Sequence, residues 1–196
     1  MYDKINITEI GLQILSLFTE DYDSSYYIRE VQRKLNISPR TAQIILNDLE
    51  EKGILESKLK GKIREYSLKR NETVIRYIMM VEQYKLISFL QKNILLSEII
   101  EKITPSIKGS GIIFGSYAKG LQKKDSDLDI FIIGEYNKEE IRKVSKKYGI
   151  DISIKCYPQN IFEKNKNNDI LVREVIKSHV LFLNSEEFIR AVLKYD

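Results

Sequence analysis

Cysteine and histidine are almost missing from this chain of 196 residues, which holds one of each. The single cysteine, Cys156, excludes an internal disulfide and a thiolate metal site. The single histidine, His179, excludes a histidine-rich metal centre and most catalytic triads that depend on an imidazole. Any catalysis must therefore rest mainly on carboxylates, hydroxyls and lysines.

Long apolar runs and the pattern of an N-terminal signal peptide are also missing. No stretch of about 18 uncharged apolar residues occurs, and Met1 to Lys4 do not open a basic segment followed by an apolar run and a cleavage site. Three prolines and nine glycines do not indicate disorder. These absences predict a globular, cytoplasmic protein with no membrane partner.

The charge balance is mild, with 32 Lys and Arg against 28 Asp and Glu and a formal net charge of +4. Such a value does not by itself indicate a nucleic-acid partner, because those proteins concentrate basic residues in patches. The length allows one full domain or two small ones. The pattern of expected elements favours an α+β protein with a domain over 1–70, a helical connector over 71–104 and a second domain over 105–196.

The first segment, residues 5–68, predicts three helices followed by a two-stranded hairpin. Apolar side chains recur at helical spacing in three stretches. Ser38 and Pro39 are typical of the start of the third helix, and Gly53 is typical of its end. The helices are expected within 7–18, 27–35 and 38–53, and the strands within 54–59 and 62–68.

Residues 71–103 are mostly helical and apolar, with a break expected at Asn93. We expect a connector whose apolar face packs on both domains; a dimerisation surface in a homodimer is the alternative. Pro105 to Gly111 then separates this helix from alternating short strands and helices. The strands are expected at 111–114, 128–133, 150–157 and 180–183, and the helices at 138–147, 170–178 and 185–194.

Two carboxylates stand two residues apart at the head of an apolar strand. Asp127 and Asp129 project from one face, because side chains alternate along a strand. Carboxylates this close repel each other unless a cation lies between them. Mg²⁺ is commonly held by one or two carboxylates together with substrate phosphates. The pair therefore predicts a site for a hard divalent cation.

A glycine-serine pair lies just upstream of these carboxylates. Gly115 and Ser116 follow an apolar strand and precede an expected short helix. Glycine lets a phosphate approach the backbone, and the N–H groups at a helix start can bind it. Ser116 adds a hydroxyl donor and Lys119 adds a positive charge. A phosphate cradle and a pair of metal-binding carboxylates are thus adjacent in sequence.

Gly115-Ser116, ten intervening residues and then Asp127-Leu128-Asp129 resemble the signature of the DNA polymerase β-type nucleotidyltransferase superfamily. The second domain is most similar to the minimal nucleotidyltransferases, prokaryotic proteins often encoded beside HEPN-type toxins. The resemblance covers about half of the chain, from Leu95 to Asp196. It departs from the family at Lys119, where many relatives carry arginine, since lysine keeps the charge but loses bidentate phosphate geometry.

The resemblance implies a small mixed sheet flanked by helices, and transfer of a nucleoside monophosphate from an NTP to a hydroxyl with two Mg²⁺ ions. We expect ATP as the donor, and a cognate HEPN-type toxin or an RNA end as the acceptor. A third carboxylate, best matched by Asp151, would complete the metal site and accept the proton. The implied catalytic and metal-binding residues are Asp127, Asp129 and Asp151, and the nucleotide-binding residues are Gly115, Ser116 and Lys119.

The three helices and hairpin of the first domain resemble a winged helix-turn-helix domain, whose third helix would enter the major groove of double-stranded DNA. The hairpin carries the basic charge, because residues 58–70 hold six basic side chains and one acid, Glu65. A basic wing on backbone phosphates is therefore expected. The residues expected at DNA are Arg40, Thr41, Gln43, Lys58, Lys60, Lys62 and Arg64. A domain that dimerises or binds a protein is the alternative.

A second class of function competes with catalysis. The chain can be read as a DNA-binding regulator or antitoxin whose second domain acts by forming a complex. The paired acids favour an enzyme, since a scaffold has no need to keep costly adjacent carboxylates. Transfer to a small molecule such as an aminoglycoside is a third alternative and would require an acceptor pocket.

Overall fold

The computed structural model describes residues 7–123, 125–166 and 168–193. Within these ranges the chain is an α+β protein with ten α-helices and two sheets. It divides into two compact units, residues 1–81 with 193–196, and residues 82–192. The boundary falls inside α4 (Glu72–Lys92). The finer division into domains over 1–70 and 105–196 with a connector over 71–104 stays a prediction.

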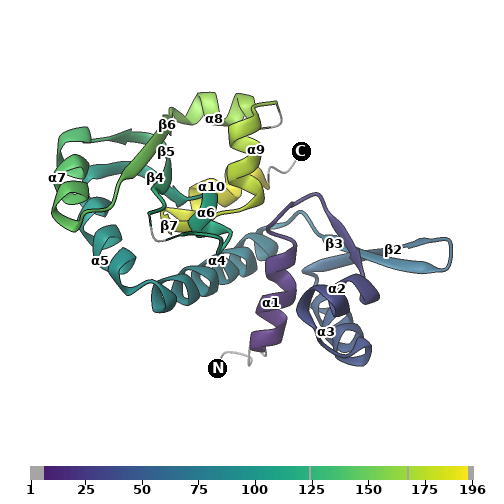
Figure 1. The fold of residues 1–196 in the computed structure, drawn as a ribbon. Helices are drawn as coiled ribbons and strands as arrows, with labels where there is room; N and C mark the ends of the chain where they lie inside the picture. Colours follow the sequence, from purple (N-terminus) through teal and green to yellow (C-terminus); the bar gives the residue numbers. More distant parts are fainter. Residues whose placement is uncertain (1–6, 124, 167, 194–196) are drawn as a thin grey trace, which may run out of the picture. The chain divides into compact units, whose positions relative to one another are not determined.

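The three helices and the hairpin expected near the N-terminus are present in the first unit (Figure 1). The structure adds a short strand that the sequence did not indicate, and the sheet has the order β1-β3-β2 with antiparallel neighbours. The elements are α1 (Glu9–Leu17), β1 (Ser25–Tyr27), α2 (Ile28–Leu35), α3 (Pro39–Glu51), β2 (Leu55–Lys60) and β3 (Ile63–Leu68).

Local chemistry accounts for the bounds of α3. The Ser38 hydroxyl accepts a hydrogen bond from the Thr41 N–H at 3.0 Å, and Pro39 occupies the first helical position. Gly53 follows the helix with a φ of +71°, a conformation that glycine adopts without strain. Leu46 of α3 is fully buried in the core of this unit, as are Phe18 and Tyr66.

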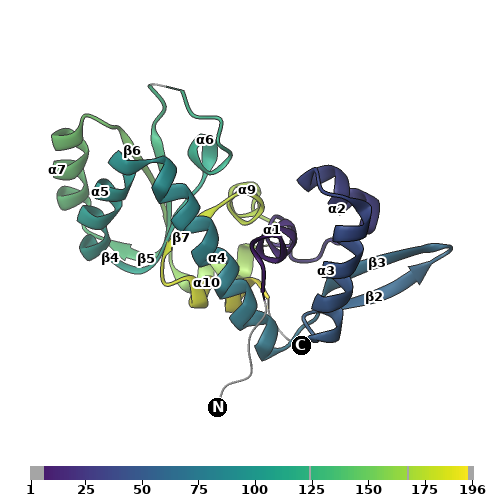
Figure 2. The ribbon, with the colours of Figure 1, turned by 90° about the horizontal axis from the view of Figure 1, so that it is seen from below.

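The second unit is built on a four-stranded sheet of order β6-β5-β4-β7, in which β6 is parallel to β5 and the other neighbours are antiparallel. Helices α5 and α7 cover one face of the sheet, and α8, α9 and α10 cover the other (Figures 1 and 2). After α4 come α5 (Ile94–Ile103), the 3₁₀ turn η1 (Thr104–Ser106), β4 (Ile107–Ile113), α6 (Gly115–Ala118), β5 (Leu128–Tyr136), α7 (Lys138–Tyr148), β6 (Ile152–Tyr157), α8 (Gln159–Asn165), α9 (Ile170–Lys177), β7 (Val180–Leu183) and α10 (Ser185–Val192).

Three expectations about this unit are corrected. Strand β4 begins at Ile107, so the separator expected over 105–111 is wrong for most of its length. Strand β6 begins at Ile152, which leaves Asp151 just ahead of the strand. Helix α8 lies in a stretch for which no helix was expected, because its sequence is mostly polar. The remaining strands and helices lie within a few residues of the expected ranges.

Strand β5 is buried on both faces of the sheet, and this places the candidate site. Leu128 and Ile130 belong to the core that α5 and α7 cover. Phe131 points the other way and stacks against Phe162 of α8, at 6.1 Å between ring centroids. Because side chains alternate along a strand, Asp129 lies on the same side as Phe131, at the beginning of β5.

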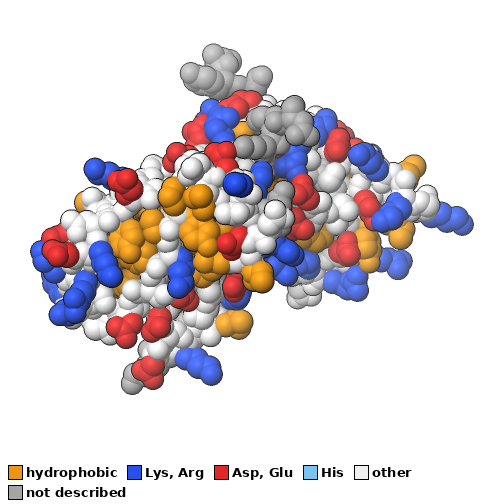
Figure 3. All heavy atoms as spheres, turned by 90° about the horizontal axis from the view of Figure 1, so that it is seen from above, with side chains coloured by type: hydrophobic (Ala, Val, Ile, Leu, Met, Phe, Trp, Pro, Cys, Tyr) orange, Lys and Arg blue, Asp and Glu red, His pale blue; other side chains and the backbone are white. Residues whose placement is uncertain are grey.

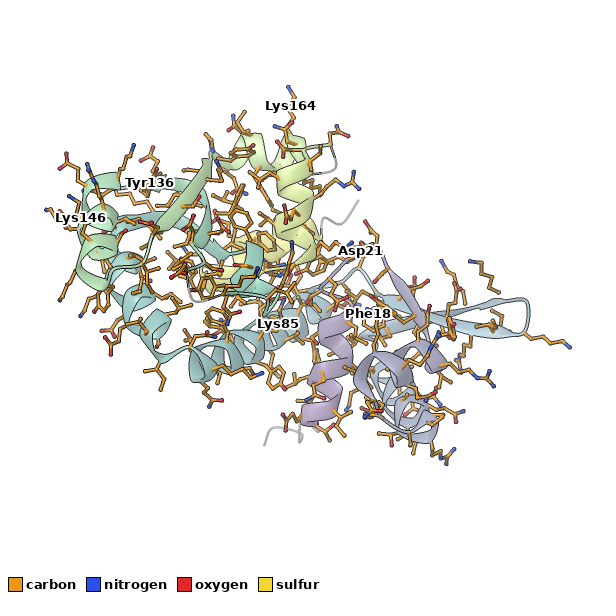
Figure 4. The ribbon with its side chains drawn as sticks, viewed as in Figure 1. Phe18, Asp21, Lys85, Tyr136, Lys146 and Lys164 are labelled. Carbon is orange, nitrogen blue, oxygen red and sulfur yellow. The ribbon has the colours of Figure 1, made fainter. Side chains whose placement is uncertain are left out.

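A cluster of charged side chains is buried in the second unit. The Glu82 carboxylate is fully buried, and its Oε1 lies 2.9 Å from Lys85 Nζ and 3.3 Å from His179 Nε2. Lys85, labelled in Figure 4, comes from the same helix as Glu82, whereas His179 directly precedes β7. The other imidazole nitrogen, Nδ1, lies 2.8 Å from the carbonyl oxygen of Ile176. Both ring nitrogens of His179 are therefore engaged within the protein.

Candidate functional site

The glycine-serine pair and the paired carboxylates meet at one end of the sheet. Strands β4 and β5 run antiparallel, with Ile113 opposite Ile130, so the end of β4 lies beside the beginning of β5. One hydrogen bond continues this pairing past the strand, from the Phe114 N–H to the Asp129 carbonyl at 3.1 Å. The glycine-serine pair and the two carboxylates, which a loop separates in the sequence, therefore lie close together in space.

Gly115 lies against the Asp129 side chain. Its φ is +69°, in the left-handed region that favours glycine. A Cβ atom at this position would lie 2.3 Å from Asp129 Oδ2. The backbone at the start of α6 therefore lies directly against the Asp129 carboxylate, and only glycine leaves space for that arrangement.

Asp129 is half-buried and surrounded by charge. Burial raises the pKa of its carboxyl, and the negative charge of Asp127 raises it further. Ser153, opposite Asp129 in the β5–β6 register, donates a hydrogen bond that acts in the other direction and lowers that pKa. Two carboxylates this close form a donor set that fits a divalent cation, which would neutralise both.

Asp151 occupies a different place. It precedes β6, its side chain is exposed, and its carbonyl accepts a hydrogen bond from the Leu128 N–H at 2.8 Å. In the part of the chain that the structure describes, no three His, Cys, Asp or Glu side chains form a group that could hold a metal ion. The structure thus brings Asp127 and Asp129 together without adding Asp151 to one cluster. The role assigned to Asp151 stays a prediction.

Lys119 follows α6 and makes an ion pair with a residue that the sequence did not single out. Its Nζ lies 2.7 Å from Oε1 of Glu174, which belongs to α9. The charge of Glu174 also acts on Asp129 and raises its pKa. Glu174 lies in the middle of an ordinary amphipathic helix, so no sequence signal could have found it. Ser153 could have been found, because strand alternation places it on the Asp129 side.

Ser116 lies half-buried in the first turn of α6. Its carbonyl accepts a hydrogen bond from the Leu121 N–H at 2.9 Å, which folds the chain back after the helix. A second hydrogen bond, from the Lys123 N–H to the Ser126 hydroxyl at 2.8 Å, shapes the loop before Asp127. The Ser116 hydroxyl as a phosphate donor stays a prediction.

The residues expected to contact DNA differ in their exposure and in the contacts that they already make within the protein. Arg40 and Gln43 are exposed on α3, whereas the Thr41 hydroxyl lies 2.8 Å from the Ser38 hydroxyl in the helix cap. Arg64 is held by Glu50 at 2.8 Å and by Ser57 at 2.7 Å. Three lysines are exposed on the second half of β2 and in the turn to β3: Lys58, Lys60 and Lys62. Arg64 is therefore engaged by short contacts within the unit, whereas the hairpin lysines are exposed.

The profile of the family described as "Nucleotidyltransferase domain" matches residues 93–191 of this chain. The chain belongs to this family. The matched segment contains the whole site, from Gly115 to Glu174. Nucleotidyl transfer is thus the general chemistry of the domain. In this nucleotidyltransferase, the candidate site is the place where Gly115-Ser116 lies against Asp129.

A curated relative extends the comparison. The protein named "Putative protein adenylyltransferase" from Methanocaldococcus jannaschii is 35% identical over 60 residues, which are 29% of this chain. The chain spans 60% of that relative's length. No solved structure gives a significant match. As a separate observation, no helix among the described residues is long and apolar enough to cross a membrane.

Replacing Gly115 by alanine should damage the site more than the fold. The new Cβ must displace Asp129 and adopt a left-handed conformation that costs about 1–2 kcal/mol. We expect nucleotidyl transfer to fall at least about tenfold, because small misplacements of reacting groups are costly. Initial rates with labelled NTP and thermal melting measure the two effects separately.

Gly149 offers a matched control for this substitution. Its φ is +65°, and no atom lies within 4 Å of a Cβ built there. Gly149→Ala therefore carries the same backbone strain without the contact to Asp129. If both variants lose transfer equally, the contact between Gly115 and Asp129 is not what the glycine preserves.

Proposed function

We propose that this nucleotidyltransferase domain moves AMP from ATP to a hydroxyl of an acceptor protein. The observation that carries the proposal is the Gly115 backbone lying against Asp129, with Asp127 and Lys119 beside it. The name of the archaeal relative supports adenylyl transfer to a protein. The resemblance to minimal nucleotidyltransferases favours a HEPN-type toxin, encoded next to this chain, as the acceptor.

The reaction is a substitution at the α-phosphorus. The acceptor oxygen forms a new bond to that phosphorus, and the bond from phosphorus to the oxygen bridging the α and β phosphates breaks. Pyrophosphate leaves with the bonding electron pair, and the hydroxyl proton passes to a base. Asp151 is assigned as that base, since its side chain is exposed directly ahead of β6.

The residues of this chain bind and orient the nucleotide. Asp127 and Asp129 would hold Mg²⁺, which when bound supplies positive charge to the phosphates and the attacking oxygen. The backbone N–H groups at the start of α6 and the Ser116 hydroxyl would donate hydrogen bonds to the triphosphate. Lys119 supplies a positive charge to the β and γ phosphates.

The decisive experiment compares two positions of the radioactive label. The purified protein is incubated with Mg²⁺, the product of the neighbouring gene and ATP labelled at either the α or the γ phosphate. We expect the acceptor to carry the α label only, and the γ label to appear in pyrophosphate. An acceptor labelled from the γ position would indicate phosphoryl transfer. An unlabelled acceptor would exclude the product of the neighbouring gene as the substrate. Competition with unlabelled GTP, CTP and UTP measures the preference for ATP.

A second function, binding of double-stranded DNA, is favoured by the hairpin of the first unit. Figure 3 shows Lys and Arg side chains gathered on this hairpin, at the right of the view. Lys58 and Lys60 make only long ion pairs, at 3.9 and 3.6 Å, with exposed side chains. Such pairs exchange readily for phosphates. A winged helix-turn-helix reading of α1 to β3 would place this hairpin along the DNA backbone, and complex formation by a regulator would then be the main activity.

Removing the three hairpin lysines tests this second function. When Lys58, Lys60 and Lys62 are replaced together by alanine, we expect DNA binding to depend less on salt. The slope of log K against log salt concentration should fall in magnitude by about 3, close to one for each lost phosphate contact. Mobility shifts on the promoter of the protein's own gene, repeated at rising salt, give the slope. Replacement of Lys143, Lys146 and Lys147 on α7 removes the same charge elsewhere. An equal loss in both variants would indicate a general charge effect and contradict a wing.

A further inference from the structure

We infer that Glu174 forms an ion pair with the Lys119 ammonium group in the nucleotide-free protein, and that the triphosphate displaces Glu174 from Lys119 when nucleotide binds. The inference rests on the proposed nucleotide site and assigns to α9 a part in controlling it. Glu174 would thus act as an internal competitor of the substrate.

The geometry of the pair is direct. Lys119 Nζ and Glu174 Oε1 lie 2.7 Å apart, within the range of a charge-assisted hydrogen bond. The Lys119 backbone is fixed by a hydrogen bond from its N–H to the Gly115 carbonyl at 3.2 Å. On the other side, Val172 and Val175 are fully buried and hold α9 in the core. Two well-anchored segments therefore present their charges to each other across the site.

Electrostatics makes this contact compete with bound nucleotide. Glu174 already acts on Asp129 as a like charge, so it lies close to the carboxylate pair as well as to Lys119. A triphosphate that reaches Lys119 brings several negative charges beside Glu174, and one ammonium cannot neutralise both anions. Binding must therefore exchange one anion for the other at Lys119.

A merely structural role for the ion pair predicts the opposite behaviour. Both side chains are considerably exposed, at 39% and 44%, and pairs this exposed contribute little to folding stability. A clamp that orders Lys119 for the nucleotide would make binding weaker when the carboxylate is removed. A competitor makes binding stronger when it is removed, and the sign of the change separates the two roles.

The test measures binding of α,β-methylene-ATP with Mg²⁺ by calorimetry, so that it does not depend on an acceptor. For Glu174→Gln we expect the Kd to fall about fivefold, because an exposed ion pair no longer competes. The KM for ATP in acceptor labelling should fall in parallel, with an unchanged melting temperature. Glu140→Gln is the matched control: it breaks an exposed pair of similar length with Lys143, at 2.6 Å on α7, and should leave the Kd unchanged.

A double-mutant cycle shows whether Glu174 acts through Lys119. In a Lys119→Met background, Glu174→Gln should have little remaining effect on the Kd. An equal gain in that background would mean that Glu174 repels the triphosphate directly, and an unchanged or raised Kd in the single variant would also overturn the exchange. If the Kd shifts as expected but no acceptor is labelled, the proposed transfer fails while the exchange stands. If the wild-type protein binds no nucleotide, both fail.

Discussion

Asp129→Asn should abolish nucleotidyl transfer without lowering the stability of the protein. Asparagine has the shape of aspartate but no charge, so Asp127 alone would remain to hold the cation. The charge stabilisation that a bound metal gives is worth several kcal/mol, and we expect the rate to fall by about a thousandfold or more. Transfer of the α label under saturating ATP measures this loss.

The expected stability follows from the surroundings of the same carboxylate. Burial and the charge of Asp127 raise the pKa of Asp129, which means that its ionised form is disfavoured in the folded chain. Removing the charge relieves that cost, and the asparagine oxygen can still accept the hydrogen bond from Ser153. The melting temperature should therefore stay the same or rise, as often happens when a functional residue is replaced.

Asp125→Asn provides the control, because Asp125 is an exposed acid of the loop before Asp127. It should transfer the label at close to the wild-type rate. Equal losses in the Asp125 and Asp129 variants would show that general negative charge, rather than the pair at the start of β5, supports the reaction. A fully active Asp129→Asn protein would remove Asp129 from the site altogether.

The helices were predictable where a cap accompanied the apolar period. Ser38 followed by Pro39 marked the start of α3, and the structure confirms the cap with a 3.0 Å hydrogen bond. Asn71, the first residue of the stretch expected to be helical, likewise accepts a hydrogen bond from the Val74 N–H, at 2.9 Å, at the start of α4. Both signals are local, because the side chain that starts the helix bonds to its own first turn. Such features need no knowledge of the rest of the fold.

The start of β4 was missed because a glycine in a sequence can indicate either a turn or a closely packed position within a strand. Gly109 was read as part of a separator and Gly111 as the point where the separator ends and the strand begins, whereas in the structure both are positions of close packing within a strand. Gly109 pairs with Gly134, and a Cβ on either would come within about 2 Å of a carbonyl oxygen of the opposite strand. At Gly111 a Cβ would meet the ring of Phe182 at 2.5 Å. These neighbours are distant in sequence, so only the folded chain distinguishes packing from a turn.

The candidate site shows the same limit. The motif and the two strands that flank it were predicted from the sequence, whereas the antiparallel pairing that brings Gly115 against Asp129 is seen only in the structure. Glu174 reaches the site because α9 packs onto the sheet, some 45 residues further along the chain than Asp129. A residue that joins a site through tertiary packing carries no local pattern, and its role could be inferred only from the distance to Lys119.

Removing the buried charge of Glu82 should destabilise the protein strongly at neutral pH. Burial works to raise the pKa of this carboxyl, but the charges of Lys85 and His179 outweigh it and bring the pKa to about 2, from an ordinary value of 4.5. In Glu82→Gln, the Lys85 ammonium loses the anion that compensates its charge. Breaking a buried ion pair on one side typically costs about 3 kcal/mol or more, and urea unfolding at pH 7 measures that loss.

The same group predicts how stability depends on pH. Because the pKa is lower in the folded chain than in the unfolded one, Glu82 contributes stability above about pH 4.5, and that contribution is lost as the pH falls toward 2. The wild-type free energy of unfolding should therefore decline between pH 5 and 2 more steeply than that of Glu82→Gln. Below about pH 2 the two proteins should differ least.

Glu72→Gln, on the same helix, is the matched control. Glu72 pairs with Arg76 at 2.7 Å, but both side chains are more than half exposed, so its loss should cost at most about 1 kcal/mol. The double variant Glu82→Leu with Lys85→Met should recover part of the stability lost in Glu82→Gln, because it removes the unpaired ammonium as well as the carboxylate. If Glu82→Gln is no less stable than Glu72→Gln, the buried cluster is not a source of stability, and the water-excluded carboxylate must be retained for another reason.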